Sequence, residues 1–391
     1  MPGRSLVASV TAARQRRYGR SHLSALWITA IVWACLQMAA TPPGFGKSPK
    51  IGPNEIQTRY RQVLSILAAG DQEAALEALF EFDTFVVGED QPWKRVEDFW
   101  RLKLRTLREM LDAESLPLLQ PVIMLHHDAN QMYLDRDRPF LASHSRIMSV
   151  ELAEIYADRA NSSGAREFSG WVMTSLGAML WHPSSVISSA DLFYRAQLVD
   201  PANPIALMGL GAAYERNASY EKAIEYFSRL LEMDPENQEA SLHLALCQVR
   251  GDEPHRDQGL DTLRSLQGPG PPDWMRSIAH QEMARSQVAG KDMEAAEATV
   301  RRGLEALPGD QQLSLQLALL LDVRRRPKEA LAVLEDIDAA NGQEPSPRLT
   351  YDVWEPDDME EIRGRLAKDA ASGLPVLAGK LGDPAPEGWG G

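Results

Sequence analysis

The sequence predicts an all-α protein: an α-solenoid of helix–turn–helix repeats that follows an apolar N-terminal segment. Leu and Ala dominate its apolar residues while aromatic residues make up only 7% of the chain, and this composition favours helices over strands. Pro201 and Pro235 lie 34 residues apart in similar surroundings, Leu198-Val-Asp-Pro-Ala-Asn203 and Glu232-Met-Asp-Pro-Glu-Asn237. A period near 34 residues is typical of a helical repeat.

Charge is distributed unevenly along the chain. The seven Lys and Arg of residues 1–54 have no Asp or Glu among them, whereas the whole chain carries a net charge of −14. The body that follows is therefore strongly acidic. This argues against a nucleic-acid partner and against a strongly anionic substrate, because phosphate contacts need clustered Lys and Arg.

Residues 1–40 are predicted to be a signal peptide or a membrane-anchor helix. Five arginines precede an 18-residue run without charge, residues 23–40, in the order of a secretory signal. Cleavage near Ala40 would release a soluble protein, a retained helix of about 27 Å would nearly span a bilayer, and lipidation at Cys35 is a third alternative. In each case we expect the body outside the cytoplasm, periplasmic or associated with the cell envelope. Residues 41–54 are predicted to be a Pro/Gly linker.

Residues 55–165 are predicted to form a divergent helical cap that continues into the repeats, with a separate domain as the alternative. Apolar residues recur there at helical spacing, as in Phe99, Leu104 and Leu107. Between these helical segments, Pro117 and Pro121 are expected to break the helical pattern around the apolar run 116–125.

The segment from Ala206 to Leu231 resembles a tetratricopeptide repeat. The matching residues are Leu210, Gly211 and Tyr214 in the first helix, and Ala223, Phe227 and Pro235 in and after the second. Gly211 and Ala223 are small, so two antiparallel helices can approach closely, while Tyr214 and Phe227 fill the space between neighbours. The resemblance implies a right-handed α-solenoid of about five repeats over residues 170–344. For the tail, residues 345–391, we expect a short helix and a disordered C-terminus.

The resemblance also implies partner binding on the face lined by the first helix of each repeat. The groove positions are mostly apolar here and lack the Lys/Asn pattern by which some family members clamp a C-terminal carboxylate. We therefore predict that the groove holds the apolar face of a helix or an extended segment of a protein partner. The alternative occupant is the chain's own tail. The predicted groove residues are Trp171, Thr174, Trp181, Ile205, Met208, Ala212, Leu242 and Leu246.

Sequence motifs for chemistry are scarce. No phosphate-binding glycine loop, dinucleotide fingerprint or Gly-x-Ser-x-Gly motif occurs. The richest polar stretch, from His126 to His144, is interpreted as a helix end whose His and Asp side chains cap and solvate a turn. Adjacent His126 and His127 would point about 100° apart on a helix, which disfavours a shared metal. Cys247 is expected to be a buried apolar residue.

The function predicted from the sequence is thus a non-catalytic protein-binding scaffold without a cofactor or metal. Two alternatives remain open at this point. One is a structural subunit of an envelope complex or a homo-oligomer. The other is a metal-dependent enzyme that uses the region from His126 to His144.

Overall fold

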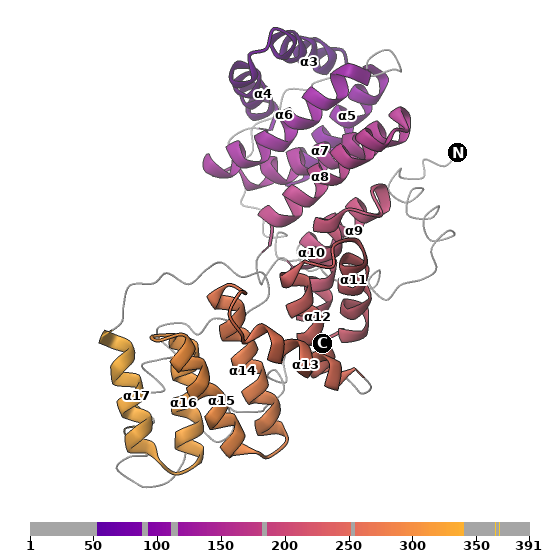
Figure 1. Ribbon diagram of the computed structural model, residues 1–391. Coiled ribbons are helices and arrows are strands. Elements are labelled where there is room, and N and C mark those ends of the chain that lie inside the picture. Colours follow the sequence, from indigo (N-terminus) through magenta and orange to yellow (C-terminus); the bar gives the residue numbers. More distant parts are fainter. Residues whose placement is uncertain are drawn as a thin grey trace. The chain divides into compact units, whose positions relative to one another are not determined.

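The computed structural model describes residues 53–87, 93–110, 116–181, 186–251 and 255–339, together with Gly364 and Ala367. All elements in these ranges are α-helices, which Figure 1 labels in chain order. They are α3 (Pro53–Ala68), α4 (Gln72–Val87), α5 (Trp93–Met110), α6 (Leu116–Asp135), α7 (Pro139–Ala160), α8 (Ser163–Met179), α9 (Val186–Val199), α10 (Pro204–Arg216), α11 (Tyr220–Met233), α12 (Gln238–Arg250), α13 (Arg256–Leu266), α14 (Asp273–Ala289), α15 (Met293–Ala306), α16 (Gln311–Val323) and α17 (Pro327–Ala339).

The helices pack in consecutive pairs. From α6 onward each even-numbered helix makes its main contact with the odd-numbered helix that follows it, as in α6 with α7 and α16 with α17. The even-numbered helices from α4 to α16 also contact one another in sequence, and we call them the even layer. The prediction of an all-α array of helix–turn–helix repeats is confirmed.

The repeated Asp-Pro-x-Asn sequence ends one pair of helices and starts the next. The side-chain oxygen of Asn203 accepts a hydrogen bond from Ala206 N at 2.9 Å, and Asn237 caps α12 through Ala240 N at the same distance. Such a cap satisfies a backbone N–H that has no partner within the first turn. Pro201 lies in the turn before the cap, where its missing N–H breaks no helical hydrogen bond.

The small residues of the repeat allow its helices to approach closely. A Cβ built on Gly211 would lie 2.5 Å from Cε1 of Phe227, so α10 meets the fully buried Phe227 ring of α11 without room for a methyl group. Ala223 is fully buried at the same pair. The packing predicted for these positions from the repeat pattern is confirmed.

The apolar core runs along the array as a series of clusters. One cluster is continuous from Ile56 in α3 to Ala206 in α10, and further clusters follow around Phe227, Leu242 and Leu317. The helices of residues 55–165 therefore share their apolar core with α8, α9 and α10. Packing of each unit mainly on its neighbours is typical of repeat proteins.

One expectation for this region is wrong. Pro117 and Pro121 do not interrupt a helix, because α6 runs unbroken from Leu116 to Asp135 with Pro121 inside it. Both prolines fall in the first two turns and are exposed, where the missing N–H of Pro117 would have no helical partner in any case.

Several predicted segments lie outside the described residues: 1–40, most of the linker 41–54, and the tail 345–391 apart from Gly364 and Ala367, which are helical. Pro53 and Asn54, assigned to the linker, begin α3. Among the described helices, none has both the length and the apolar character needed to cross a bilayer.

Candidate functional site

The predicted groove residues come from neighbouring even helices, apart from Trp181, which follows the end of α8, and they differ in exposure. Trp171 in α8 and Ile205 in α10 are exposed, at 44% and 50%, whereas Met208 and Trp181 are partly buried. The other four pack inside the array: Thr174, Ala212, Leu242 and Leu246. Even helices are covered on several sides, so only a narrow stripe of each remains accessible. In this arrangement the buried four can support a partner-binding surface but cannot touch a partner.

Trp171 is the most distinctive exposed side chain of the even layer. Its ring stacks on His127 of α6 with 5.5 Å between ring centroids, and on Phe168 of its own helix with 6.4 Å. Phe168 in turn contacts the edge of Tyr156 in α7. A large aromatic ring is thus held in place by neighbours on two sides while much of its surface stays accessible.

His127 is itself held by hydrogen bonds to two helices. Its Nδ1 lies 2.9 Å from Oδ1 of Asp128, and its Nε2 lies 2.5 Å from Oγ of Ser175 in α8. Asp128 also accepts a hydrogen bond from Nε2 of Gln72 in α4. Because a carboxylate only accepts, Nδ1 of His127 is the donor to Asp128. The Ser175 hydroxyl lies within hydrogen-bond distance of both Nε2 of His127 and the Val172 carbonyl oxygen.

These residues join three successive helices of the even layer. We call them the Trp171 platform, which consists of Gln72, His127, Asp128, Phe168, Trp171 and Ser175. Of these residues only Trp171 was predicted to line the groove, while His127 and Asp128 were considered only as part of the polar stretch from His126 to His144. The spacing of Phe168, Trp171 and Ser175 on one helix was available as a signal, but Gln72 and His127 reach the site through tertiary packing that no local pattern encodes.

The order Ser175–His127–Asp128 repeats the hydrogen-bond chain of acyl-transfer enzymes, yet it lacks the companion feature of that chemistry. Acyl transfer needs backbone N–H groups directed at the developing oxyanion. Ser175 lies in the interior of α8, where backbone N–H groups are engaged along the helix. The geometry therefore orients the His127 ring under Trp171 rather than forming an acyl-transfer centre.

The histidines of the stretch from His126 to His144 are buried, so the interpretation that they solvate a turn is wrong, whereas Asp135 and Asp137 are exposed at the turn. His126 has no exposed surface and shares a 2.7 Å hydrogen bond with the Tyr60 hydroxyl. His144 is 2% exposed and neither of its ring nitrogens has a partner. Burial, with the nearby Lys103 charge, lowers the pKa of both histidines well below the usual value. The expected turn does occur, between Asp135 and Pro139, but the histidines point into the core.

Beside these histidines lies a fully buried ion pair. Nζ of Lys103 in α5 is 2.7 Å from both carboxylate oxygens of Asp83 in α4, and the Tyr133 hydroxyl donates to Asp83 at 2.8 Å. Burial lowers the pKa of Lys103, and the charge of Asp83 opposes that effect. No surface reaches this pair, so it stabilises a particular packing of α4, α5 and α6 rather than binding a ligand.

A row of charged side chains joins α10, α12 and α14, the middle helices of the even layer. Glu215 in α10 lies 2.7 Å from Nδ1 of His243 in α12, and Arg250 in α12 makes a bidentate contact with Glu282 in α14 at 2.9 and 3.0 Å. Burial opposes ionisation of Glu282, but the charge of Arg250 outweighs it and lowers the Glu282 pKa to about 2. Each carboxylate thus has a built-in partner.

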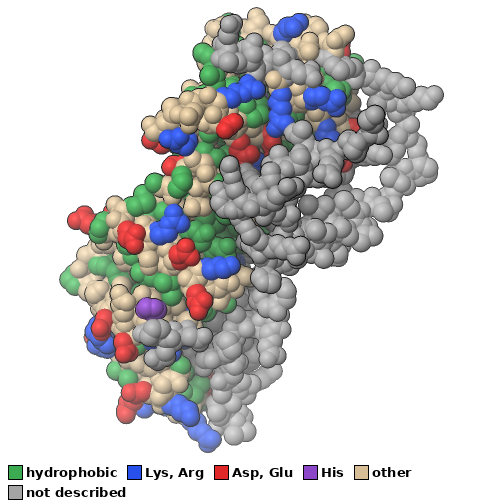
Figure 2. Space-filling view, turned by 90° about the vertical axis from the view of Figure 1, so that its right-hand side faces the viewer, with side chains coloured by type: hydrophobic (Ala, Val, Ile, Leu, Met, Phe, Trp, Pro, Cys, Tyr) green, Lys and Arg blue, Asp and Glu red, His purple; other side chains and the backbone are tan. Residues whose placement is uncertain are grey.

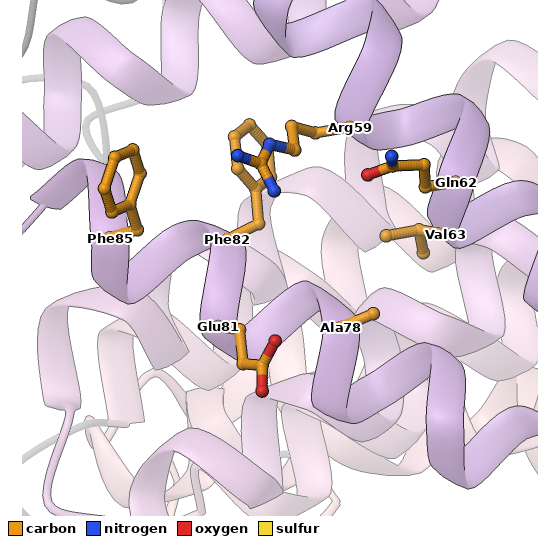
Figure 3. A pocket seen from close by; sticks show the side chains of 7 residues that line it. All are labelled: Arg59, Gln62, Val63, Ala78, Glu81, Phe82 and Phe85. Atoms are coloured by element: carbon orange, nitrogen blue, oxygen red, sulfur yellow. The ribbon is translucent and has the colours of Figure 1, made fainter.

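No metal centre is found in the part of the chain that the structure describes. No three His, Cys, Asp or Glu side chains gather there closely enough to hold a metal ion. A cavity of about 270 Å³ lies between α3 and α4, where Figure 3 shows Arg59, Phe82 and Phe85 at its wall. Arg59 is paired with Glu55 at 3.1 Å, and Gln62 and Glu81 add further polar groups to the lining. Cys247 is buried, as predicted.

The surface chemistry is mixed on the side seen in Figure 2. On the described residues of this side, acidic and basic side chains are interspersed with apolar ones, and several Lys and Arg side chains gather in the upper part of the view. Nucleic-acid binding surfaces are, in contrast, strongly and continuously basic.

Comparison with known proteins agrees with the repeat architecture. Residues 204–247, which cover α10, α11 and most of α12, match the family model described as tetratricopeptide repeat. No curated protein matches the sequence. Among solved structures, a thermophilic TPR protein of Thermus thermophilus has 18% identity and a TM-score of 0.39, covering 51% of this chain and 99% of its own.

Two further solved structures are similar at the same level. A tetratricopeptide repeat protein from Parabacteroides merdae has 12% identity and a TM-score of 0.38, covering 80% of this chain and 98% of its own. YrrB, described as a TPR protein with an unusual peptide-binding site, has 15% identity and a TM-score of 0.31, covering 44% of this chain and 85% of its own.

Proposed function

We propose that this chain, a tetratricopeptide-repeat protein by the match of residues 204–247, binds a protein or peptide partner on its even layer, with Trp171 as the anchor. Members of this repeat family are generally non-catalytic interaction scaffolds that bind protein or peptide partners. We place the contact at the Trp171 platform and expect it to continue toward Ile205 and Met208.

The observation that carries the proposal is an exposed but immobilised tryptophan. Trp171 is 44% exposed although its ring stacks on His127 and Phe168. Aromatic anchors dominate the energetics of many interfaces, and an anchor that is already ordered loses little further conformational entropy on binding. The hydrogen bonds that His127 makes with Asp128 and Ser175 maintain this arrangement before any partner arrives.

Quantitative affinity capture with the full chain tests the proposal. We expect that Trp171→Ala depletes the captured partner at least about tenfold, since truncation of an interface hot spot typically costs about 2 kcal/mol or more. Met233→Ala in α11 is the matched control, because Met233 is similarly exposed, at 50%, but lies outside the even layer. Far-UV circular dichroism should show that both variants stay helical.

Retention of the same partners in the same amounts by the Trp171→Ala variant would contradict the assignment. Capture by the Ile205→Ala variant measures how far the contact extends along the even layer, since Ile205 is 50% exposed on α10. A loss at Trp171 without a loss at Ile205 would confine the contact to the platform.

We also propose that the repeats act outside the cytoplasm. The support is the basic start followed by the uncharged residues 23–40. Full-length fusions to alkaline phosphatase, active only outside the cytoplasm, and to a cytoplasmically fluorescent protein should give opposite signals at the C-terminus. Fluorescence without phosphatase activity would refute this localisation.

A further inference from the structure

We infer that the side chain which the partner places on the Trp171 platform is basic, an Arg or a Lys of a peptide segment. This inference rests on the proposed function and adds the chemistry of the ligand. Three features favour a basic side chain: the charges near the ring on α8, the charges on the neighbouring stripe of α6, and the electron-rich indole ring.

On α8 a carboxylate, not a cation, adjoins the Trp171 ring. At about 100° per residue, Glu167 lies about 40° from Trp171 around the helix and one turn before it, whereas Arg166 lies about 140° away. Glu167 is exposed and belongs to the first half of α8. Its charge therefore faces the same side as the ring, and the Arg166 charge does not.

On α6 the stripe beside the platform is also acidic. Asp128, Gln131 and Asp135 follow one another at spacings of three and four residues, so they share one face of the helix. Gln131 donates to Asp135 at 2.7 Å, which orients that carboxylate without neutralising it. The Asp128 side chain is 34% exposed beside His127.

The first cation after the end of α6, Arg136, is already engaged. Nη2 of Arg136 lies 2.7 Å from Glu77 of α4, and its guanidinium stacks over Phe80 at 4.1 Å from the ring centroid. The cation Lys103 of α5 has no exposed surface. The charges of Glu167, Asp128 and Asp135 are therefore not balanced by either of these cations.

A partly exposed indole ring with carboxylates on the same face of its own helix and on the neighbouring α6 is complementary to a cation. The π face of Trp attracts a guanidinium or an ammonium group within about 6 Å, and the carboxylates supply a second attraction to the same group. Arg suits the site better than Lys, because a planar guanidinium can stack on the ring while its N–H groups reach a carboxylate. An acidic side chain would be repelled from the same position.

Fluorescence anisotropy with defined peptides tests this inference on the full-length protein. The probes are three fluorescein-labelled nonapeptides of one apolar background that differ at two positions, which hold Arg, citrulline or Glu. Citrulline keeps the shape of Arg without its charge. We expect the Arg peptide to bind about 5- to 30-fold tighter than the citrulline peptide and the Glu peptide to bind most weakly. The Arg advantage should shrink between about 0.05 and 0.5 M NaCl, because salt screens exposed charges.

Two double variants with the same change in charge locate the effect. Glu167→Gln with Asp135→Asn should remove most of the Arg advantage, whereas Glu221→Gln with Glu232→Gln in α11 should keep it. Both pairs are exposed, so neither removes a buried contact. Trp171→Ala should weaken the Arg and citrulline peptides alike.

The outcomes separate the inference from the proposed function. Equal affinity for Arg and citrulline, with dependence on Trp171 intact, would overturn the basic ligand and leave the anchor standing. An Arg advantage that survives Glu167→Gln with Asp135→Asn would also overturn it. If binding of all peptides ignores Trp171→Ala, the anchor itself is wrong. If the Arg peptide binds better after removal of the five arginines in residues 1–20, the site is occupied by the chain's own basic segment and not by a partner.

Discussion

At the scale of single residues, the ion pair of Lys103 with Asp83 shows how much the core relies on polar contacts. Neither side chain has any exposed surface, and the Tyr133 hydroxyl completes the contacts of Asp83. A buried charge without its partner is strongly unfavourable, whereas an intact buried pair is worth little more than a well-packed apolar pair. The two members are therefore expected to be strongly coupled.

We predict that Lys103→Met destabilises the protein by about 3–5 kcal/mol, because it leaves the Asp83 carboxylate buried and unpaired. Adding Asp83→Leu should recover part of that loss. Urea denaturation of the wild type, both single variants and the double variant measures the coupling. Arg59→Met provides the control, since Arg59 pairs with Glu55 at the surface and its loss should change stability by less than about 1 kcal/mol. Additive single effects would contradict the coupling.

Gly211 allows α10 to pack closely against the Phe227 ring of α11. A Cβ at this position would lie 2.5 Å from the Phe227 ring, so Gly211→Ala must shift α10 against α11 and is expected to cost about 1–3 kcal/mol. Gly164→Ala is the matched control, because nothing lies within 4 Å of its added methyl group and alanine favours a helix. Thermal unfolding of both variants makes the comparison. Equal melting temperatures would show that the two helices can separate without cost.

At the scale of helices, histidines in different parts of the array respond to pH in opposite ways. In α6 and α7, burial and the Lys103 charge lower the pKa of His126 and His144 well below 6.5. In α12, burial alone would lower the pKa of His243, but the charge and hydrogen bond of Glu215 raise it above 6.5. The folded chain thus disfavours protonation of His126 and His144 and favours protonation of His243.

The sign of each effect follows from linkage. Below pH about 6.5 the unfolded chain protonates His126 and His144 while the folded chain resists it, so the free energy of unfolding falls as the pH drops. His243 contributes stability that is complete below pH about 6.5 and is lost as the pH rises through its raised pKa. Acid therefore weakens the packing around α6 and α7 and preserves the contact between α10 and α12.

We predict that His144→Leu reduces the acid sensitivity of the protein without destabilising it at pH about 7.5. Neither ring nitrogen of His144 has a partner, so the apolar replacement leaves no donor or acceptor unsatisfied. Unfolding free energies at pH about 7.5 and about 5.5 should differ less in the variant than in the wild type. His243→Gln, which removes the proton held by Glu215, should instead lower stability more at the acidic pH than at the alkaline one. An unchanged pH dependence in the His144→Leu variant would contradict this account.

The helices were predictable from sequence where the local pattern and the tertiary packing agree. Asp200-Pro-Ala-Asn203 encodes both the stop of α9 and the cap of α10, and Gly211 opposite Phe227 encodes the close packing of the repeat. His126 and Lys103 were not predicted as core residues, because polar side chains are usually exposed and their position on an apolar helix face was given less weight. The spacing of Phe99, Lys103 and Leu107, four residues apart on one helix face, would have revealed Lys103.

The candidate site was predictable only in part. The repeat register selected Trp171 and Ile205, which are exposed, but it also selected Thr174 and Leu242, which pack against neighbouring helices. Register gives the direction of a side chain relative to its own helix, while exposure depends on how closely the next helix approaches. The contacts of His127 with Asp128 and Ser175 depend on the packing of α6 on α8, which no local spacing determines.

At the scale of the whole molecule, the distribution of the core decides how the described array should unfold. One apolar cluster is continuous from Ile56 to Ala206, while separate clusters centre on α12 with α14 and on α15 with α16. In a linear array, each unit is stabilised mainly by itself and its immediate neighbours. A weakening at one end should therefore not spread evenly to the other.

We predict that Leu79→Ala in α4 lowers hydrogen-exchange protection across the helices that share its cluster, α3 to α10, and leaves α15 to α17 nearly unchanged. Leu79 is fully buried in the first cluster, so its truncation should cost that unit about 2–5 kcal/mol. Leu320→Ala in α16, also fully buried, is the reciprocal change and should lower protection at the other end. Peptide-resolved exchange at one temperature and pH makes the comparison. A uniform loss of protection in either variant would show a single cooperative unit and contradict this division. If the two patterns are reciprocal, the Trp171 platform belongs to the unit of α3 to α10, and a partner bound there should protect that unit first.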